Sequence, residues 1–383
     1  MEKKLDAPVV FAPCEDYREP DLSKALLSLL EPLGGIQSFV SPGERILLKP
    51  NILAGRASDR AVTTHPLLVA SVVKACVEVG AEVIVGDSPG LESLKRAAGV
   101  SGIFAAAESA GAAMVSFGPE KTKISPTLPD GKYRSFEVAK ILDDVDGVIN
   151  LAKLKTHGQM ALSLGVKNTF GCIPGLEKAQ WHLKAGSSET FAGMLLELHS
   201  AVDPRLTLID GIVAMEGNGP FSGDPRATGF LCASRDARAC DLAVARYLGF
   251  YEEDVQTLLA PGFEHRNLAL ELLSSLSRHG LSGPSFEPAS KFHHIAWLPF
   301  APLRRFFRKS FTPSPKIDSD RCIACYRCVD ICPAKAIRPS RPAEVPELSM
   351  DKCIRCFCCQ EICPEGAISV ECGLLLKIFG KFF

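Results

Sequence analysis

Two runs of cysteine near the C-terminal end of the chain have a spacing suited to metal binding. They read CIACYRCVDICP at 322–333 and CIRCFCCQEICP at 353–364, and both fit the pattern C-x2-C-x2-C-x3-C-P. In that pattern three closely spaced thiolates hold one [4Fe–4S] cluster, while the fourth crosses to the other cluster. The spacing therefore predicts two [4Fe–4S] clusters, one held by Cys322, Cys325, Cys328 and Cys363 and the other by Cys353, Cys356, Cys359 and Cys332.

Zinc and disulfides are the alternatives for these cysteines. Zinc also binds paired CxxC motifs, but it does not require four cysteines at this spacing followed by proline, twice over. Disulfide frameworks are typical of small secreted chains, whereas this chain has 383 residues and most of its 15 cysteines are crowded into one segment. Cys358 and Cys372 have no place in the pattern. We expect Cys358 to be a packed thiol beside a cluster and Cys372 to be inert.

A second set of chemically active side chains follows the predicted strands of the first 290 residues. The catalytic candidates are Lys155, His157, Lys167 and His65, and the candidates for substrate binding are Lys49, Asn51, Asp87, Ser88, Lys153 and Asn168. Taken singly, most of these residues sit in ordinary turn sequences, and a lone histidine is more often packed or a helix cap than a ligand. Several lysines at one end of a sheet, however, are costly unless they face an anion or an acidic partner.

The convergence of these side chains predicts a pocket for a small molecule that carries a carboxylate or a phosphate. Histidine changes its charge near neutral pH, so His65 and His157 are suited to proton transfer. No sequence signal supports a flavin in this pocket, although nothing in the sequence contradicts one.

The elements that must position this set are short apolar runs alternating with helical patterns. The predicted strands are Val9–Ala12, Arg45–Lys49, Glu82–Gly86, Met114–Phe117, Gly147–Leu151, Leu206–Asp210 and Gly229–Ala233. The predicted helices include Asp21–Leu30, Pro66–Val79, Leu91–Ala98, Glu189–Leu198 and Arg238–Leu248. This alternation indicates a layered α/β fold with a largely parallel sheet, in which ligands bind at the carboxyl ends of the strands. Pro66 suits a first helical turn, which we expect Thr64 or His65 to cap.

Several motifs in this region resemble the family called domain of unknown function 362. They are SPGER at 41–45 through KPN at 49–51, THP at 64–66, GDSP at 86–89, KLKTH at 153–157 and GVKN at 165–168. The resemblance runs from about residue 40 to 248 and implies the α/β sheet, with a C-terminal pair of [4Fe–4S] motifs that members often carry. A fainter similarity to the N-terminal domain of nickel-dependent lactate racemases implies a polar cleft. The cofactor-attachment sequence of that family is not recognisable here, so we predict no nickel cofactor.

The chain therefore divides into an α/β domain over 1–287 and a small α+β two-cluster ferredoxin-like domain over 316–372. The linker at 288–315 contains basic and aromatic residues but no acidic residue, and the tail at 373–383 reads GLLLKIFGKFF. We favour the interpretation that the aromatic side chains of the linker pack the two domains together, while the charged ends of its basic side chains stay in water. Peripheral contact with a membrane, or contact with an acidic redox partner, is the alternative.

The composition limits the classes of function. A formal net charge of −1 argues against a nucleic-acid-binding protein. No apolar run reaches the roughly 18 residues of a membrane-spanning helix. The N-terminus, MEKKLDAPVVFAPC, has no apolar core of a secretory signal. We expect a cytoplasmic protein.

Three functions remain. The first is an oxidoreductase in which electrons pass between the clusters and a small anionic substrate or cofactor in the cleft, and it predicts a cluster facing the lysines and histidines. The second is an electron carrier or redox sensor whose α/β domain recognises a partner, with clusters turned outward. The third is an isomerase or lyase with structural clusters. We favour the first because a fused relay raises the effective concentration of the electron donor. A separate redox protein is the expected partner.

Overall fold

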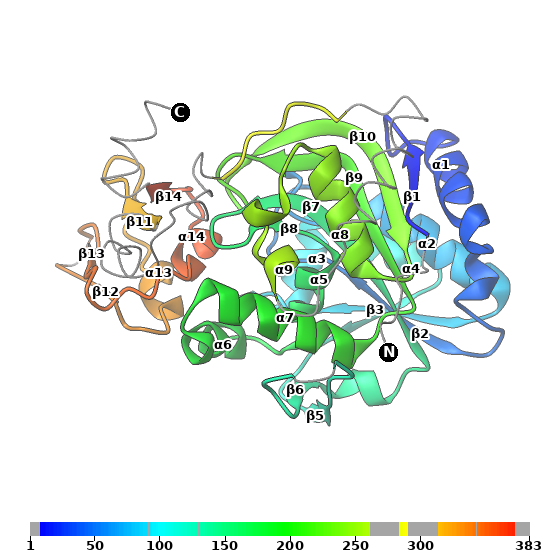
Figure 1. Ribbon diagram of the computed structural model, residues 1–383, viewed down its shortest axis with the longest axis horizontal. Coiled ribbons are helices and arrows are strands. Elements are labelled where there is room, and N and C mark those ends of the chain that lie inside the picture. Colours follow the sequence, from blue (N-terminus) through cyan, green and yellow to red (C-terminus); the bar gives the residue numbers. More distant parts are fainter. Residues whose placement is uncertain are drawn as a thin grey trace.

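A mixed sheet of eight strands forms the centre of the α/β domain (Figure 1). The computed structural model describes residues 8–90, 92–128, 131–260, 283–289, 313–341 and 343–371. The sheet order is β1-β10-β9-β7-β2-β3-β4, with β8 paired to β7. These strands are β1 Val10–Pro13, β2 Arg45–Pro50, β3 Glu82–Asp87, β4 Ala113–Ser116, β7 Gly147–His157, β8 Ala161–Ser163, β9 Leu206–Glu216 and β10 Asp224–Ser234. Neighbours from β9 to β4 pair in parallel and only β10 and β8 run against them, so the predicted α/β fold is confirmed.

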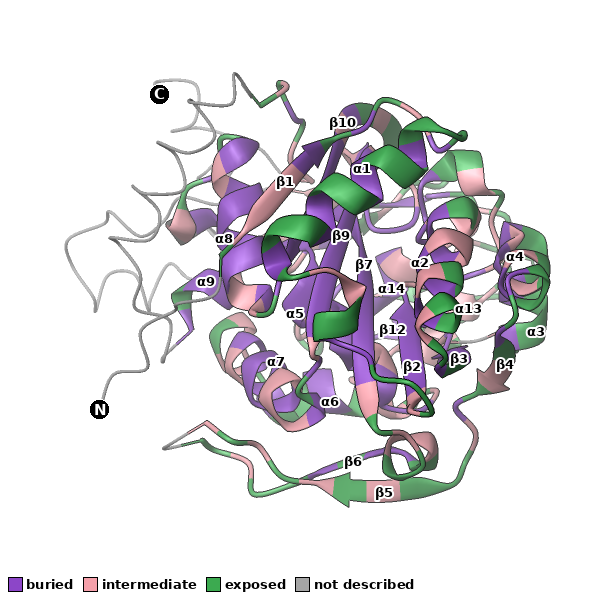
Figure 2. Cartoon of the chain, turned by 90° about the vertical axis from the view of Figure 1, so that its right-hand side faces the viewer, coloured by how far each residue is buried: buried purple, intermediate pink, exposed green. Residues whose placement is uncertain are grey.

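Helices cover both faces of the sheet. One face carries α1 Asp21–Leu30, α2 Pro66–Val79, α3 Leu94–Ser101 and α4 Ile103–Ser109. The other carries α5 Gly165–Asn168, α6 Glu177–Ala185, α7 Ser188–Val202, α8 Ala237–Tyr247 and α9 Gln256–Leu259. Ile46 and Leu48 of β2 pack among the first group, whereas Leu47 between them packs on the second. Because a strand covered on both faces is apolar at every position, these strands read as continuous apolar runs. Figure 2 shows the central strands buried and α1 and α2 exposed along their outer sides.

Helix α2 begins as the sequence predicts. His65 is its N-cap, and the ring Nδ1 accepts a hydrogen bond from the backbone N–H of Leu67 at 3.3 Å. Pro66 occupies the first turn, and Gly80 ends the helix with a φ of 98°. The side chain of Thr64 turns to the sheet instead, where it donates to the carbonyl of Leu151 at 2.8 Å. This arrangement fixes the chain at the end of β2, beside the polar residues.

Strands β7, β9 and β10 are each longer than predicted, and β7 continues to His157 instead of ending at Leu151. Lys153 and Lys155, predicted in a loop, therefore lie on the strand itself. The extension is held on one side by β9, where Lys153 pairs with Asp210, and on the other by β8, where Lys155 pairs with Ser163. A ribbon of β5 Lys121–Ile124 and β6 Phe136–Ala139 was also not predicted.

The C-terminal domain is a small two-fold repeat. Its helices are α13 Arg327–Ile331 and α14 Cys358–Ile362, and its strand pairs are β11 Ser314–Ile317 with β14 Ile368–Glu371 and β12 Ile337–Arg338 with β13 Glu347–Leu348. Ile337 and Ile368, the equivalent residues after each cysteine run, meet in its core. Figure 1 shows α14 on the side of this domain that faces the sheet. Most of the linker predicted at 288–315, the tail at 373–383 and Cys372 lie outside the described residues. Among the described residues, no helix is long and apolar enough to cross a membrane.

Candidate functional site

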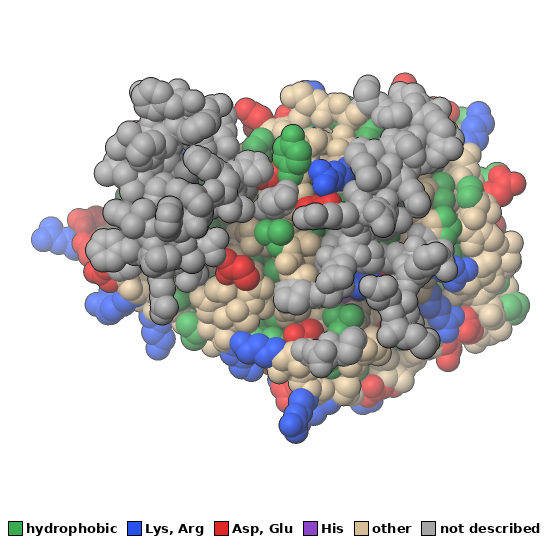
Figure 3. All heavy atoms as spheres, viewed as in Figure 1, with side chains coloured by type: hydrophobic (Ala, Val, Ile, Leu, Met, Phe, Trp, Pro, Cys, Tyr) green, Lys and Arg blue, Asp and Glu red, His purple; other side chains and the backbone are tan. Residues whose placement is uncertain are grey.

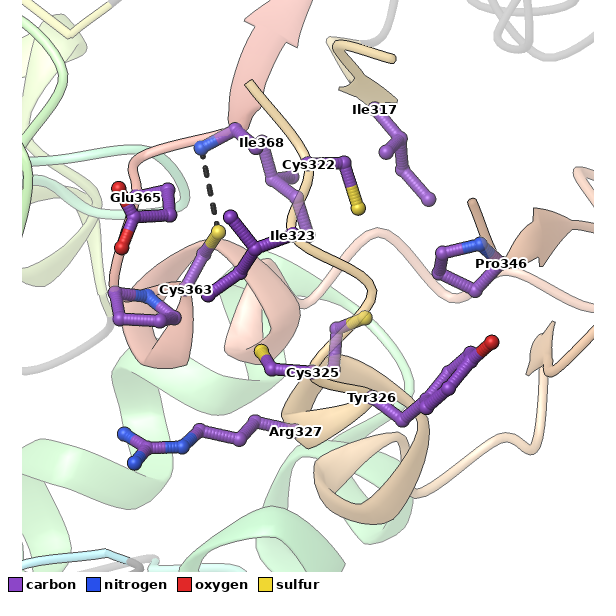
Figure 4. Close-up of a pocket in the computed structure, with 13 residues that line it drawn as sticks. Ile317, Cys322, Ile323, Cys325, Tyr326, Arg327, Pro346, Cys363, Glu365 and Ile368 are labelled. Atoms are coloured by element: carbon purple, nitrogen blue, oxygen red, sulfur yellow. Dashed lines mark hydrogen bonds between the residues drawn. The ribbon is translucent and has the colours of Figure 1, made fainter. Parts of the chain in front are cut away.

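The eight cysteines of the repeat line two separate pockets, which we call the first and second cluster pockets. The first is lined by Cys322, Cys325, Cys328 and Cys363 (Figure 4). The second is lined by Cys332, Cys353, Cys356 and Cys359. Each pocket combines three cysteines of one run with the last cysteine of the other. This is the crossed ligand set that the spacing predicts.

The backbone around the two pockets repeats in detail. The residues on either side of the second cysteine of each run are left-handed, with φ of 51° at Ala324, 58° at Tyr326, 58° at Arg355 and 60° at Phe357. These turns wrap each run around its own pocket.

Backbone donors also point at the crossing sulfurs of the repeat. The Ala336 N–H donates to Cys332 Sγ, and the Ala367 N–H donates to Cys363 Sγ, both at 3.2 Å. N–H groups directed at cysteine sulfur are among the features that set cluster potentials. The donor sets and their surroundings therefore fit two [4Fe–4S] clusters. Cys358 is buried and lines the second cluster pocket, as expected of a packed thiol beside a cluster.

Two of the predicted lysines are neutralised inside the α/β domain. Lys49 Nζ lies 2.8 Å from Asp87 Oδ1, and Lys153 Nζ lies 2.9 Å from Asp210 Oδ2, with all four side chains buried. Such pairs are tolerated because each charge has a partner and further hydrogen bonds. The Asp87 carboxylate also accepts the N–H groups of Ile52 and Ser88.

Ser88, predicted to bind substrate, is buried beside this pair in the loop that follows β3. Its Oγ accepts a hydrogen bond from the Gly175 N–H at 2.7 Å. Its carbonyl accepts one from Lys178 Nζ at 2.8 Å. Burial lowers the pKa of Lys178 to about 8. The turn sequence at 86–90 is thus bonded to the segment that precedes α6.

His65 belongs to the Lys153–Asp210 network. Its backbone N–H donates to Asp210 Oδ2 at 3.0 Å, and its ring stacks on Tyr17 with centroids 3.6 Å apart. The Tyr17 hydroxyl donates to Asp210 Oδ1 at 2.7 Å and accepts from Lys153 Nζ at 2.9 Å. Burial lowers the pKa of His65 to about 4, so its imidazole is neutral at pH 7. The ring Nδ1 is used by the helix cap, which leaves Nε2 for other partners.

Among the described residues, no carboxylate is hydrogen-bonded to Lys155. Its Nζ donates to Asn51 Oδ1 at 2.6 Å and to the Val62 carbonyl at 2.8 Å. Asn51 in turn donates to Asn168 Oδ1 at 3.0 Å, and Asn168 donates to the Lys49 carbonyl at 3.1 Å. Burial, reinforced by the charge of Lys167, lowers the pKa of Lys155 well below its usual range. Three predicted site residues are thus joined in one chain of hydrogen bonds that leads back to β2.

His157 contacts the ferredoxin-like domain. Its Nε2 lies 2.6 Å from Glu361 Oε1 of α14. Its Nδ1 accepts the N–H groups of Gln159 and Met160 at 3.1 and 3.2 Å, so the ring proton belongs on Nε2 and is donated to Glu361. Burial, with a contribution from Lys167, lowers the pKa of His157 to about 4. At neutral pH the contact is therefore a hydrogen bond from a neutral imidazole to a carboxylate.

Lys167, on the single turn of α5, is the most open of the predicted cations, with intermediate burial. Its charge acts on Lys155, His157 and Glu361. The structure thus brings Lys155, His157, Lys167, Asn51 and Asn168 together. Lys49, Asp87 and Ser88 lie in one adjoining network, and Lys153 and His65 lie in another.

Further contacts fix α14 against the end of the sheet. Gln360 is 1% exposed, and its Nε2 donates to the side chain of Asn218 and to the Gly219 carbonyl. Gly158 is packed so closely that an added Cβ would lie 2.5 Å from Gln360 Oε1. Arg56 donates to the carbonyl of Pro364, next to the first-pocket ligand Cys363, at 2.5 Å.

Glu361 and Gln360 were not predicted, although they lie inside the second cysteine run. The first run has Val329 and Asp330 at the same positions, so the run itself does not show which helix faces the sheet. Tyr17 and Asp210, which complete the Lys153 network, were not predicted as site residues either. The signal for them is the burial of Lys153, which requires a nearby acid.

Comparisons with known proteins agree with these observations. Residues 46–246 match the model of the family described as "Domain of unknown function (DUF362)", and residues 314–364 match that of the 4Fe-4S dicluster domain. The thylakoid-associated protein sll1697 of Synechocystis is 39% identical over 247 residues, which is 64% of this chain and 76% of that protein. The two [4Fe–4S] clusters predicted from the spacing are thereby confirmed.

Two solved structures are also similar in part. The lactate racemase apoprotein of Thermoanaerobacterium thermosaccharolyticum is 13% identical with a TM-score of 0.41, over 62% of this chain and 56% of that one. A crystal structure of a Thermotoga maritima protein is 15% identical with a TM-score of 0.34, over 52% and 53%. The chain thus spans little more than half of each. With the family model covering more than half of its length, the chain belongs to the DUF362 family and carries a C-terminal 4Fe-4S dicluster domain.

Proposed function

We propose that the protein is an iron–sulfur oxidoreductase that moves electrons between two [4Fe–4S] clusters and a small anionic molecule at the end of the sheet. The observation that carries the proposal is the hydrogen bond of 2.6 Å between His157 and Glu361. Glu361 is two residues from Cys359, which lines the second cluster pocket, and His157 is among the residues predicted for the cleft. Clusters that faced away from the lysines and histidines at the end of the sheet would favour an electron carrier instead.

The chain's own groups suit this role. The clusters supply one electron each when bound. Lys155 and Lys167 provide positive charge for an anion, and Asn51 holds the Lys155 ammonium group in place. Burial lowers the pKa of Lys155, which brings its proton transfer closer to neutral pH. The network of Lys153, Asp210 and Tyr17 would keep His65 oriented at the same end of the sheet.

Two other functions are supported less well. An electron-transfer protein or redox sensor would need no buried cluster of lysines beyond those paired with acids. An isomerase or lyase with structural clusters would not need a cluster ligand two residues from the contact with His157. We propose a separate redox protein as the electron donor or acceptor, and a cytoplasmic location. The name of the Synechocystis relative associates that protein with thylakoids. Peripheral membrane contact of this chain remains a prediction, since the segments that suggest it are mostly outside the described residues.

Reoxidation of the reduced protein tests the proposal. The anaerobic holoprotein would be reduced with dithionite, freed of excess reductant, and mixed with a panel of small oxo-acids, unsaturated acids and phosphate esters. We expect at least one compound to reoxidise the clusters, and we expect Lys155→Met, His157→Asn and Lys167→Met to slow that reaction by about 100-fold or more. Lys140→Met, at an exposed ion pair with Asp143, is the control. Rates equal to wild type in all three variants, with iron content intact, would reject the enzyme proposal.

A further inference from the structure

Glu361 is a carboxylate of one domain placed beside a lysine and two histidines of the other. It lies on α14 of the ferredoxin-like domain, whereas the groups that act on it, Lys167, His157 and His182, belong to the α/β domain. One Glu361 oxygen lies 2.6 Å from Nε2 of His157, so an oxygen anion already occupies the position in front of this donor.

The α/β domain supplies no carboxylate for this position from its own described residues. Lys49 and Lys153 are matched by Asp87 and Asp210 at 2.8 and 2.9 Å. Among the residues that the structure describes, Lys155 donates only to an amide oxygen and a carbonyl oxygen. Within the described part of the chain, Lys167 makes no side-chain hydrogen bond or ion pair, although it lies close enough to act on Glu361. Among the described residues, Lys155 and Lys167 are therefore the two site lysines without a hydrogen-bonded carboxylate, and Glu361 is the carboxylate with the strongest effect on Lys155.

The Nε2–H group of His157, which donates to Glu361, is oriented by contacts within the α/β domain. Two backbone N–H groups hold Nδ1 of His157, so its Nε2–H points out of the loop whatever occupies the site. The side chain of His157 is fully buried, whereas that of Glu361 is 18% exposed. The carboxylate is therefore the part of this contact that solvent reaches first. A donor fixed before binding lowers the cost of capturing a ligand.

Among the described residues, polar contacts hold the ferredoxin-like domain here. Apart from the Glu361 contact they include Gln360 to Asn218, Arg56 to the Pro364 carbonyl, and an ion pair of 3.8 Å between Arg327 and Glu92. Polar interfaces between domains of one chain are typical of domains that move relative to each other. Withdrawal of α14 would uncover the His157 donor and the two site lysines together.

We propose that Glu361 is an internal occupant of a carboxylate-binding site made by Lys155, His157 and Lys167, and that a carboxylate substrate takes its place when α14 withdraws. The inference rests on the proposed function, because it names the substrate class of the same site. The class of ligand follows from the group that occupies the site, the carboxylate of Glu361. A carboxylate is a planar anion, and one of its oxygens accepts the single Nε2–H of His157. A tetrahedral phosphate would bring more acceptor oxygens than this donor set pairs.

Anion binding to anaerobically prepared holoprotein tests the proposal. Equilibrium dialysis would measure binding of acetate and of inorganic phosphate to wild type, Glu361→Ala, Glu361→Gln and the control Glu344→Ala, which changes an exposed glutamate of the same domain. Removing the side chain empties the site, so we expect Glu361→Ala to bind acetate at least about tenfold more tightly than wild type. Glu361→Gln keeps the volume filled and should not gain affinity. Adding Lys167→Met to Glu361→Ala should remove the gain.

Each outcome decides one point. Equal acetate affinity in wild type and Glu361→Ala, or an equal gain in Glu344→Ala, would overturn the proposal. A gain for phosphate larger than that for acetate would overturn the assignment to carboxylates. If acetate binds as expected but no compound reoxidises the reduced protein, the proposed oxidoreductase function fails while the carboxylate site stands. If reoxidation occurs without the gain in acetate binding, only the role of Glu361 fails.

Discussion

His182 lies in the α/β domain with its ring stacked on Phe191, at 3.9 Å between centroids, and set edge-on against Phe170. It is 5% exposed, and its Nδ1 has no hydrogen-bond partner among the described residues. Burial lowers its pKa from 6.5 to about 3. A histidine held neutral in this way makes stability depend on pH, because the unfolded chain binds a proton that the folded chain excludes.

The direction in which the unfolding free energy changes with pH gives a prediction for His182→Leu. Below pH 6.5 the unfolded state takes up the proton, so stability is lost as the pH falls from 6.5 toward the folded pKa. Between pH 6.5 and about 5.5 wild type should lose about 1 kcal/mol of unfolding free energy more than His182→Leu. Urea unfolding at the two pH values measures the difference. Leu183→Ala, at an exposed position of the same helix, should keep the wild-type dependence. Identical pH dependence in wild type and His182→Leu would contradict the prediction.

The sequence indicated correctly that several lysines lie at the end of the sheet, where burial of their charge is costly, while their role in a site stays a prediction. Lysines at 49, 153 and 155 are each 0–2% exposed, and each is held by polar partners at the end of the sheet. The partners were harder to predict, because Asp210 and Glu361 are separated from their lysines and histidine by 57 and 204 residues. Only the fold brings such residues together. The cysteine ligands could be predicted from their spacing, because three of the four ligands of each cluster pocket come from one short run.

At the scale of elements, β7 shows why strand ends are hard to predict at a binding site. An apolar run predicts a strand only as far as Leu151, yet pairing with β9 and β8 carries it to His157. Lysine and histidine interrupt the apolar pattern because they face the polar layer, and cross-strand hydrogen bonds decide the strand's length. The crossed cysteine set was predictable, since it depends on an internal repeat.

The crossed set makes a prediction about pairs of cysteine substitutions. Cys363→Ala alone should lower the iron content of anaerobically purified protein from about eight to about four atoms per chain. Adding Cys322→Ala removes a ligand of the same pocket and should leave about four, whereas adding Cys353→Ala should leave almost none. If each run held its own cluster, the two double variants would behave the other way round. Iron analysis distinguishes them, and Cys358→Ala, outside both ligand sets, should keep about eight.

At the scale of the whole molecule, the described residues show which contacts associate the two domains. On the face seen in Figure 3, acidic and basic side chains are interspersed, in line with the formal net charge of −1. The ferredoxin-like domain is held by specific contacts among the described residues. Its position depends on α14, on the loop that follows β7 and on the segment at 217–222.

Gly158 offers a test of this association without removing any side chain. A Cβ at this position would lie 2.5 Å from Gln360 Oε1 and 3.0 Å from Val370 Cγ2. Gln360 cannot turn aside freely because its amide is buried and bonded to the loop at 218–219. Overpacking of this kind costs about 1–3 kcal/mol. Here the cost falls on the domain interface, so Gly158→Ala should let the ferredoxin-like domain separate before the sheet unfolds.

The expected signature is a split between two probes of urea unfolding. In wild type we expect the interface contacts to couple the two domains, so that the visible absorbance of the clusters and the far-ultraviolet circular dichroism are lost at the same urea concentration. In Gly158→Ala the absorbance should be lost at lower urea than the dichroism. Gly193→Ala is the matched control. It also replaces a glycine by alanine, inside α7, but the added Cβ meets no atom within 4 Å. In Gly193→Ala the absorbance and the dichroism should still be lost together. The urea midpoint should rise slightly, because alanine has a better helix propensity than glycine. Coincident transitions in Gly158→Ala would show that α14 is not fixed through this loop.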